Sequence, residues 1–315
     1  MATYLVTGGC GFIGSNLVRA LVERGEKVRV LDNLSTGRIE NLAGLEANVQ
    51  LIRGDITDAA TVAEAVAGCD YVLHQAALPS VPRSIEAPLE SDRINVHGTL
   101  VVLEAARKAK VKRVVYAASS SAYGETPTLP KVETMTPSPL SPYGVSKLAA
   151  EHYMSVYTYC YGLETVSLRY FNVFGPRQDP NSHYAAVIPR FVTAALSGRS
   201  PTIFGDGLQS RDFCFIDNAV EANLLACTAP GASGRVFNVA CGVRTTLLEV
   251  IGTLSEVVGR KILAVHEAER AGDIKHSLAD ITLARQVLGY TAGVGIAEGL
   301  ARTVEWYRQD VGKVA

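Results

Sequence analysis

The stretch Thr3-Tyr4-Leu5-Val6-Thr7-Gly8-Gly9-Cys10-Gly11-Phe12-Ile13-Gly14 decides the fold, because a short apolar run leads directly into a glycine-rich turn. The apolar residues that follow, from Leu17 to Val22, recur at helical spacing. Gly8, Gly11 and Gly14 would allow a tight turn, close approach to a pyrophosphate and close packing of helix on strand. The stretch therefore predicts a strand, a glycine turn and a helix whose N-terminus binds phosphate.

A carboxylate follows the second predicted strand. The run 28–31 predicts a second strand that ends in Asp32, 18 residues past Gly14, where a carboxylate can accept hydrogen bonds from an adenosine ribose. The next residue is Asn33 rather than an arginine, so a 2′-phosphate would meet an unpaired carboxylate. The combination favours NAD over NADP. The alternative is an ordinary turn aspartate.

Strands and helices keep alternating through the first half of the chain, which predicts an α/β fold with a doubly wound parallel sheet. Ligands of such sheets lie at the carboxyl ends of the strands, where Asp55, Ile56 and the run Gln75-Ala76-Ala77 occur. Asn95, inside a helical segment, either bends the helix or serves as a hydrogen-bonding post in the core. The further strands and helices are expected at 50–53, 58–67, 71–74, 91–109 and 113–117.

Tyr143 and Lys147 stand four residues apart in Ser141-Pro142-Tyr143-Gly144-Val145-Ser146-Lys147. Ser141 is a suitable N-cap and Pro142 suits the first helical position, so both side chains should face one site. An ammonium there would lower the pKa of the phenol from about 10 and give a base near neutral pH. The alternative is a surface tyrosine and lysine without function.

A run of hydroxyl groups follows the fifth predicted strand, in Ala117-Ala118-Ser119-Ser120-Ser121-Ala122-Tyr123-Gly124. Such a run is often only a loop. At the carboxyl edge that should present Tyr143, however, a serine could bind a substrate oxygen and help relay its proton.

Composition limits the choice of partner. The 315 residues allow two unequal lobes, and the net charge of -1, from 30 basic and 31 acidic residues, indicates no nucleic-acid or membrane surface. A small-molecule partner is expected, in a cytoplasmic protein without a leader or a membrane span. The six cysteines show no C-x-x-C spacing and the histidines no metal-binding motif, so we predict neither disulfides nor a metal.

The Thr7–Gly14 turn, Ser119 before Tyr123-Gly124, and Tyr143 with Lys147 together resemble the extended short-chain dehydrogenase/reductases, Rossmann-fold enzymes of nucleotide sugars. The resemblance spans nearly the whole chain. It implies that Tyr143 is the catalytic base, that Lys147 binds the nicotinamide ribose and tunes the phenol, and that Ser119 contacts the sugar. The NAD contacts expected from the residues and the resemblance together are Gly8, Gly11, Phe12, Ile13, Gly14, Asp32, Asn33, Ser35, Thr36, Gly37, Asp55, Ile56, Gln75, Ala76, Ala77, Asn95, Tyr143, Lys147 and Tyr170.

The resemblance also implies a substrate lobe for a UDP-sugar, beginning near Arg169-Tyr170-Phe171-Asn172. We expect an NAD-binding domain at 1–172, to which 213–240 returns with a helix near 218–225, and a sugar-binding lobe at 173–212 and 241–315. Arginine suits phosphate because its planar fork makes two hydrogen bonds at once. The expected substrate contacts are Ser80, Ser119, Ser120, Ser121, Tyr143, Asn172, Val187, Arg190, Arg211, Arg270, Asp273 and Ser277.

The resemblance discriminates among reactions. Dehydratases of this superfamily carry an Asp-Glu pair, and UDP-glucuronate decarboxylases a glutamate, at positions where this chain has Ser120 and Ser121. Both reactions are therefore disfavoured, which leaves epimerisation at C4 through a 4-keto sugar. Some members of the fold bind NAD(P) without turnover, but they usually lack the tyrosine or the lysine.

Ser277 bears on the choice of sugar. In epimerases restricted to UDP-glucose and UDP-galactose, the resemblance places a tyrosine there, whereas relatives that accept N-acetyl sugars have a small residue. We therefore expect interconversion of UDP-GlcNAc and UDP-GalNAc, with UDP-glucose and UDP-galactose also accepted. A strict UDP-glucose epimerase and a UDP-glucuronate epimerase are the alternatives, and an ordinary loop serine is the simpler interpretation of Ser277. The resemblance also implies a homodimer through the helices near 91–109 and 142–161.

Overall fold

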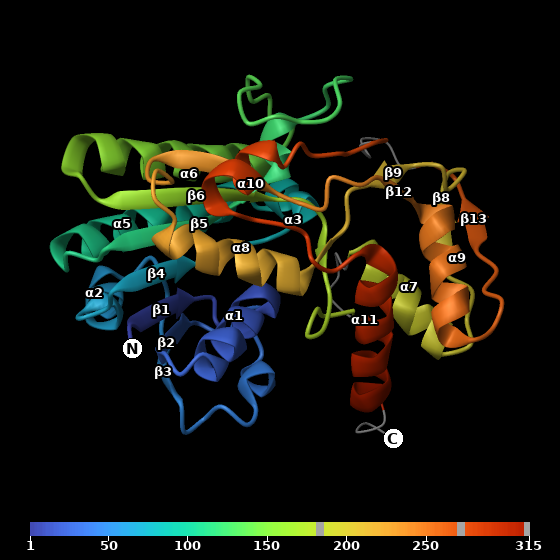
Figure 1. Cartoon of the computed structure of the whole chain (residues 1–315), viewed down its shortest axis with the longest axis horizontal. Helices are drawn as coiled ribbons and strands as arrows, with labels where there is room; N and C mark the ends of the chain where they lie inside the picture. Colours follow the sequence, from blue (N-terminus) through green and yellow to red (C-terminus); the bar gives the residue numbers. More distant parts are fainter. Residues whose placement is uncertain (181–185, 270–274, 312–315) are drawn as a thin grey trace.

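A seven-stranded parallel sheet forms the larger part of the protein, as a computed structural model describes it for residues 1–180, 186–269 and 275–311 (Figure 1). The order of the strands is β11-β6-β5-β4-β1-β2-β3, which confirms the predicted doubly wound sheet. The strands are β1 (Thr3–Thr7), β2 (Lys27–Asp32), β3 (Val49–Arg53), β4 (Tyr71–His74), β5 (Arg113–Ser119), β6 (Glu164–Tyr170) and β11 (Arg235–Val239).

Alternate residues of each strand enter cores on opposite faces of the sheet. In β1, Tyr4 and Val6 belong to one core and Leu5 to the other. Helices α1 (Phe12–Glu23) and α8 (Ile216–Thr228) cover the first face. Helices α2 (Ala59–Val66), α5 (Gly98–Lys108) and α6 (Pro142–Tyr161) cover the second. Because all seven strands are parallel, their carboxyl ends meet at one edge.

Helix α6 begins and ends as its sequence predicts. The hydroxyl of Ser141 accepts a hydrogen bond from the Gly144 N–H at 3.1 Å, and Pro142 occupies the first turn. The helix ends at Gly162, whose φ of 70° is the left-handed conformation that glycine adopts most easily. The helix is therefore fixed at both ends by local sequence.

The segment near 91–109 is less regular than predicted. It consists of α4 (Pro88–Asp92), one π-helical turn η2 (Arg93–His97) and α5, and α3 (Val81–Glu86) precedes it. Asn95 lies in the π-helical turn, and such turns are frequent at functional sites. Two 3-10 turns, η1 (Ile39–Leu42) and η3 (Ser120–Tyr123), follow β2 and β5.

Most of the remaining elements form a second lobe beside the sheet, on the right in Figure 1. Helix α8 and strand β11 return to the sheet inside the predicted range 213–240, while the exact lobe boundaries stay predictions. The second lobe holds short strand pairs and helices, namely β7 (Val173–Phe174) with β10 (Cys214–Phe215), β8 (Thr202–Phe204) with β13 (Val265–Glu267), β9 (Ser210–Arg211) with β12 (Thr245–Thr246), α7 (Val187–Leu196), α9 (Leu247–Val258) and α11 (Ile296–Val311). Helix α10 (Thr282–Leu288) instead packs against α8 and β11 of the sheet (Figure 1).

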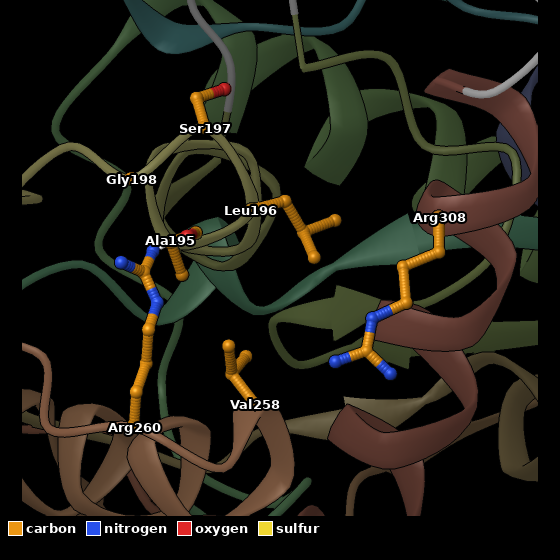
Figure 2. A pocket seen from close by; sticks show the side chains of 7 residues that line it. All are labelled: Ala195, Leu196, Ser197, Gly198, Val258, Arg260 and Arg308. Atoms are coloured by element: carbon orange, nitrogen blue, oxygen red, sulfur yellow. Dashed lines mark hydrogen bonds between the residues drawn. The ribbon is translucent and has the colours of Figure 1, made fainter.

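Arg260 stabilises the end of α7 in this lobe. Figure 2 shows its side chain reaching from the end of α9 toward Ala195, whose carbonyl accepts its hydrogen bond. A cation at a helix C-terminus complements the helix dipole. Across the described ranges, no helix is both long and apolar enough to cross a membrane.

Candidate active site

The glycine turn between β1 and α1 is packed so closely that it has no room for side chains at Gly8 and Gly14. A Cβ on Gly8 would lie 2.8 Å from the backbone of Ala76, and one on Gly14 would lie 2.1 Å from the Gly8 carbonyl oxygen. Gly8 also has a φ of 68°. Gly11 is the N-cap of α1 and provides no side-chain hydrogen bond, so the first N–H groups of Phe12 and Ile13 can meet an anion. The turn therefore suits a pyrophosphate.

Asp32, at the end of β2, is 7% exposed and held in place by backbone N–H groups. One carboxylate oxygen accepts from Cys10 at 2.9 Å and the other from Leu34 at 2.8 Å. Each oxygen keeps a second lone pair, which a ribose hydroxyl can use. Gly37 backs this carboxylate, since a Cβ there would lie 2.9 Å from it, and the neighbouring Asn33, Ser35 and Thr36 are exposed.

The end of β3 is tied to the loop after β2. Asp55 accepts hydrogen bonds from Thr57 and from Asn33, whose amide lies 3.0 Å away. Burial acts to raise the pKa of the Asp55 carboxyl, but these hydrogen bonds hold it below its usual value. Ile56 is buried against Gly98 of α5. Both predicted residues lie just beyond the carboxyl end of β3, and their contact with NAD stays a prediction.

Gln75 and Tyr170 lie together at the carboxyl ends of β4 and β6. The Tyr170 hydroxyl donates to the Gln75 side chain at 3.2 Å, and the Gln75 amide donates to Asn223 of α8 at 3.1 Å. Burial raises the pKa of the Tyr170 phenol. The sequence did not identify Asn223, because its contact with this edge depends on the return of α8. Ala76 and Ala77 follow with small, half-buried side chains.

Asn95 is a hydrogen-bonding post in the core. Its carbonyl oxygen accepts from Leu78 N–H at 2.7 Å, and its amide donates to the Leu78 carbonyl and to Ser146 on α6. Of the two interpretations of Asn95, the structure agrees with the post. A direct contact of Asn95 with NAD stays a prediction.

Tyr143 and Ser119 meet at the carboxyl edge. Ser119 forms a hydrogen bond with the Tyr143 phenol. The Ser119 oxygen also accepts from the N–H of Ser121 at 3.1 Å and from its hydroxyl at 2.8 Å. Because both acceptor positions of Ser119 are used, its own proton is free to be donated to Tyr143 or to a substrate oxygen. Ser120 follows in the same turn, η3.

The pKa of the Tyr143 phenol differs from our prediction. Burial raises it, and the hydrogen bond with Ser119 opposes this rise. The Lys147 ammonium donates to the Ala117 carbonyl at 2.9 Å and lies 5.9 Å from the centre of the Tyr143 ring. Burial also lowers the pKa of Lys147 to about 7, so this lysine is only partly charged at neutral pH.

Two residues that the sequence did not identify hold the backbone of Tyr143. The Ser84 hydroxyl in α3 accepts from the Tyr143 N–H at 3.0 Å, and Ser146 donates to the Tyr143 carbonyl at 2.9 Å. Ser84 lies 59 residues away in the chain, so no local pattern could have indicated it.

Four of the predicted substrate residues line one cavity of about 280 Å³ in the second lobe. Arg190 also lies over the Phe204 ring, with 5.9 Å between its guanidinium carbon and the ring centre. Arg211 donates to the carbonyls of Ser210 and Lys275, which fixes its side chain at the cavity wall. The four residues are Asn172, Val187, Arg190 and Arg211.

Ser277 contacts one of these cavity residues. Its hydroxyl accepts from the Asn172 amide at 3.3 Å, and its N–H donates to Ser210 at 3.0 Å. Asn172 has a φ of 32°, a strained conformation for a non-glycine residue. Ser80, the N-cap of α3, likewise has a φ of 99°, and such residues cluster at functional sites. The predicted contacts Arg270 and Asp273 lie outside the described residues.

The described residues suit a dinucleotide at this edge. The tight glycine turn, the fixed Asp32 carboxylate and the Tyr143–Lys147 pair all lie where the parallel strands end. Within the same ranges, no group of three or more His, Cys, Asp or Glu side chains is placed to hold a metal ion.

Known proteins resemble the chain over nearly its full length. A profile of the NAD dependent epimerase/dehydratase family matches residues 4–240. The UDP-glucose 4-epimerase of Mycolicibacterium smegmatis is 41% identical over 308 residues, which cover 96% of this chain and 98% of that protein.

Two solved structures extend the comparison. A UDP-N-acetylglucosamine 4-epimerase from Methanobrevibacter ruminantium M1, in complex with UDP-N-acetylmuramic acid, has a TM-score of 0.94 and 41% identity and covers 98% of this chain and 99% of its own. A UDP-glucuronic acid 4-epimerase from Bacillus cereus, in complex with UDP-4-deoxy-4-fluoro-glucuronic acid and NAD, has a TM-score of 0.90 and 32% identity, with 98% and 99% covered. The chain therefore belongs to the NAD-dependent epimerase/dehydratase family, and NAD is its cofactor, as predicted.

Proposed function

We propose that the protein epimerises a UDP-hexose at C4 through a transient 4-keto sugar. The observation that carries this proposal is the pairing of Tyr143 with Ser119 at the carboxyl edge, between the glycine turn and the cavity that Arg190 and Arg211 line. The Tyr143–Ser119 pair offers acid and base chemistry next to a nicotinamide cofactor. The cavity offers the two cations of Arg190 and Arg211 for a diphosphate.

Each residue of the pair has a distinct task in this reaction. Tyr143 would accept the proton of the sugar O4 and later return it, and Ser119 would donate to the same oxygen and keep it aligned. Lys147, held by the Ala117 carbonyl, has two further N–H groups to offer a ribose hydroxyl. When bound, NAD supplies the acceptor for the C4 hydride and the donor that returns it. The 4-keto sugar must rotate in the site between the two transfers, because inversion requires hydride return to the opposite face.

The residues beside the pair support epimerisation over water loss and decarboxylation. Both of those reactions require a carboxyl group next to the serine, and this chain has the hydroxyls of Ser120 and Ser121 there. Ser121 is also engaged, since it donates to Ser119. A binding protein without turnover is a weaker proposal, because such a protein does not need the aligned Ser119–Tyr143 contact.

We further propose that the preferred substrates are UDP-GlcNAc and UDP-GalNAc, with UDP-glucose and UDP-galactose also accepted. The small Ser277 side chain, held by Asn172, leaves space that a bulky residue would close. A strict UDP-glucose epimerase or a UDP-glucuronate epimerase remains the alternative. A cytoplasmic location stays a prediction.

Substitution of Ser277 tests the choice of sugar. Ser277→Tyr should lower kcat/KM for UDP-GalNAc at least about tenfold and leave that for UDP-galactose within about threefold, because the ring excludes only the acetamido group. Ser277→Ala is the matched control and should keep both activities. The measurement is C4 inversion for acetylated, plain and uronic UDP-hexoses. Turnover of UDP-galactose but not UDP-GalNAc by the unmodified protein would make it a strict UDP-glucose epimerase.

We also propose a homodimer formed through α5 and α6. These helices pack on each other, and α6 presents Val145, Tyr153 and Val156 to solvent on its outer face. An exposed apolar stripe on a helix is a typical surface for association.

A further inference from the structure

We infer that His74 is a positioning residue, which couples the glycine turn of the cofactor site to the catalytic helix α6 through a buried chain of hydrogen bonds. The chain runs through the side chains of Thr7, His74, Thr99, Asn95 and Ser146, and we call it the His74 chain. Apart from Asn95, which is also a predicted NAD contact, its members are distinct from the residues expected to touch NAD or the sugar. The inference rests on the proposed function, because its meaning is the alignment of Tyr143 with the cofactor.

His74 lies at the end of β4, in the middle of the sheet. Its neighbours in the pairing register are Thr7 at the end of β1 and Tyr116 on β5, and its side chain is fully buried. The imidazole packs 5.6 Å from the Tyr116 ring. A polar ring in such a place must find partners for both of its nitrogens.

The partners of His74 determine where its proton lies. Thr99 on α5 donates its single hydroxyl proton to the Asn95 carbonyl at 2.6 Å. The contact of 3.0 Å between the Thr99 oxygen and His74 Nε2 therefore requires a proton on Nε2. Burial, followed by the nearby charge of Lys147, lowers the pKa of His74 to about 3, so the ring is neutral.

The other nitrogen of His74 therefore accepts a hydrogen bond. Thr7 donates its hydroxyl proton to His74 Nδ1 at 2.7 Å. The Thr7 oxygen in turn accepts from the N–H of Ala76 at 3.2 Å. Ala76 is the residue whose backbone a Cβ on Gly8 would strike at 2.8 Å. This half of the chain thus ends at the floor of the glycine turn.

The other half of the chain ends at the catalytic tyrosine. Asn95 receives the Thr99 proton on its backbone carbonyl, and its side chain donates to Ser146 at 3.0 Å. Ser146 then donates to the carbonyl of Tyr143 at 2.9 Å. Asn95 lies in the π-helical turn η2, an irregularity that places its carbonyl and its amide on two different partners.

All five side chains of the His74 chain are buried, so water does not replace a lost partner easily. Only one distribution of protons satisfies every contact, which fixes the relative positions of the turn and the helix. Catalysis is sensitive to such positions, because a displacement of about 1 Å can cost about 100-fold in rate. Loss of a hydrogen bond in the His74 chain should therefore lower turnover more than it lowers substrate binding.

Two threonine substitutions provide a matched test in the full-length protein with bound NAD. Thr99→Val removes the hydroxyl that donates to Asn95 and so interrupts the His74 chain. Thr165→Val removes a buried hydroxyl that donates to Met154 of α6 at 2.7 Å, far along the helix from Tyr143. Both changes should lower Tm by similar amounts. Only Thr99→Val should lower kcat at least about tenfold, with KM for the UDP-sugar within about threefold and NAD content unchanged.

Variants of His74 separate the two halves of the chain. The amide of His74→Gln can replace Nε2 as donor to Thr99 but loses Thr7, and the carbonyl of His74→Asn can replace Nδ1 as acceptor from Thr7 but loses Thr99. Each should lower kcat, and adding Thr99→Val to His74→Asn should cost less than about a further twofold, because the link from Thr7 to Asn95 is already interrupted at the Thr99 side chain. Equal kcat values for Thr99→Val and Thr165→Val, or additive losses in the double variant, would overturn the inference.

A second readout does not depend on turnover. The pKa of Tyr143 can be measured by ultraviolet difference titration, with Tyr143→Phe as the subtracted reference. Thr99→Val should move this pKa by about half a unit or more, and Thr165→Val should leave it unchanged. If the unmodified protein inverts no UDP-hexose, the proposed function fails while this titration still decides the role of the His74 chain. An unchanged pKa would reject it.

Discussion

Tyr143 shows how the setting of one side chain decides its chemistry. Burial makes its phenolate costly, and the hydrogen bond with Ser119 offsets part of this cost. Ser119 can give this support because Ser121 fills both of its acceptor positions. The acid/base oxygen and its partner therefore act as a unit.

Removal of the Tyr143 oxygen should abolish epimerisation without unfolding the protein. Tyr143→Phe keeps the ring and should lower kcat by about 100-fold to 10,000-fold, with NAD content unchanged. Ser119→Ala should have a smaller effect, since water or Ser120 can replace part of its function, and Ser120→Ala serves as the neighbouring control. Stopped assays of C4 inversion measure all three. If Ser119→Ala turns over at the unmodified rate, the sugar contact belongs to Ser120 or Ser121.

Lys147 should make stability depend on pH. Its folded pKa of about 7 lies below the usual lysine value of 10.5, so the unfolded chain binds more protons between these values. Stability should therefore rise as pH increases from 7 toward 10. Lys147→Met should remove about 3 kcal/mol of this rise. Urea unfolding of the nucleotide-free protein at pH 7 and 9.5 measures it, with the exposed Lys27→Met as control. Parallel curves for Lys147→Met and the unmodified protein would contradict the prediction.

At the scale of elements, the sequence predicted the features that depend on residues close together in the chain. The glycine turn before α1 follows from residues within one short stretch, and so does the start of α6 at Ser141 and Pro142. The π-helical turn could not be predicted in this way. Its Asn95 is satisfied by Leu78 and Ser146, which are distant in sequence and meet it only in the folded core.

The same difference between local and tertiary effects applies to the candidate site. Asp32, Tyr143 and Lys147 were identified because their spacing places them at strand and helix ends. His74 was not identified as a site residue, because its importance depends on cross-strand partners rather than on its place in a motif. The raised pKa of Tyr143 was also missed, since burial is a property of the whole fold. Sequence thus located the reacting groups, and tertiary contacts decided their acidity and alignment.

At the scale of the whole molecule, the two lobes share the strands' carboxyl edge. Asp212, fully buried beside the cavity residue Arg211, accepts backbone hydrogen bonds from Cys241, Gly242 and Ala279. It therefore ties the loop before β10 to the segment that follows Ser277. Burial raises the pKa of the Asp212 carboxyl to about 6, although these backbone hydrogen bonds oppose the rise.

The proposed dimer involves the solvent-facing side of the catalytic helix α6. Helix α6 turns Lys147 inward and Val156 outward, where Val156 is 46% exposed, and Leu89 of the adjacent α4 is 86% exposed. A second copy that covers this stripe would bury it and support α6 from behind.

Sedimentation equilibrium tests this arrangement, with an expected mass of twice the 33.6 kDa chain. Val156→Glu should yield monomers, because a dimer would bury an unpaired carboxylate. Val265→Glu is the matched control, since Val265 is 51% exposed on β13 in the second lobe, and it should remain dimeric. If the monomeric Val156→Glu protein also loses turnover while retaining NAD, α6 depends on the second copy for its alignment. A monomeric mass for the unmodified protein would reject the dimer itself.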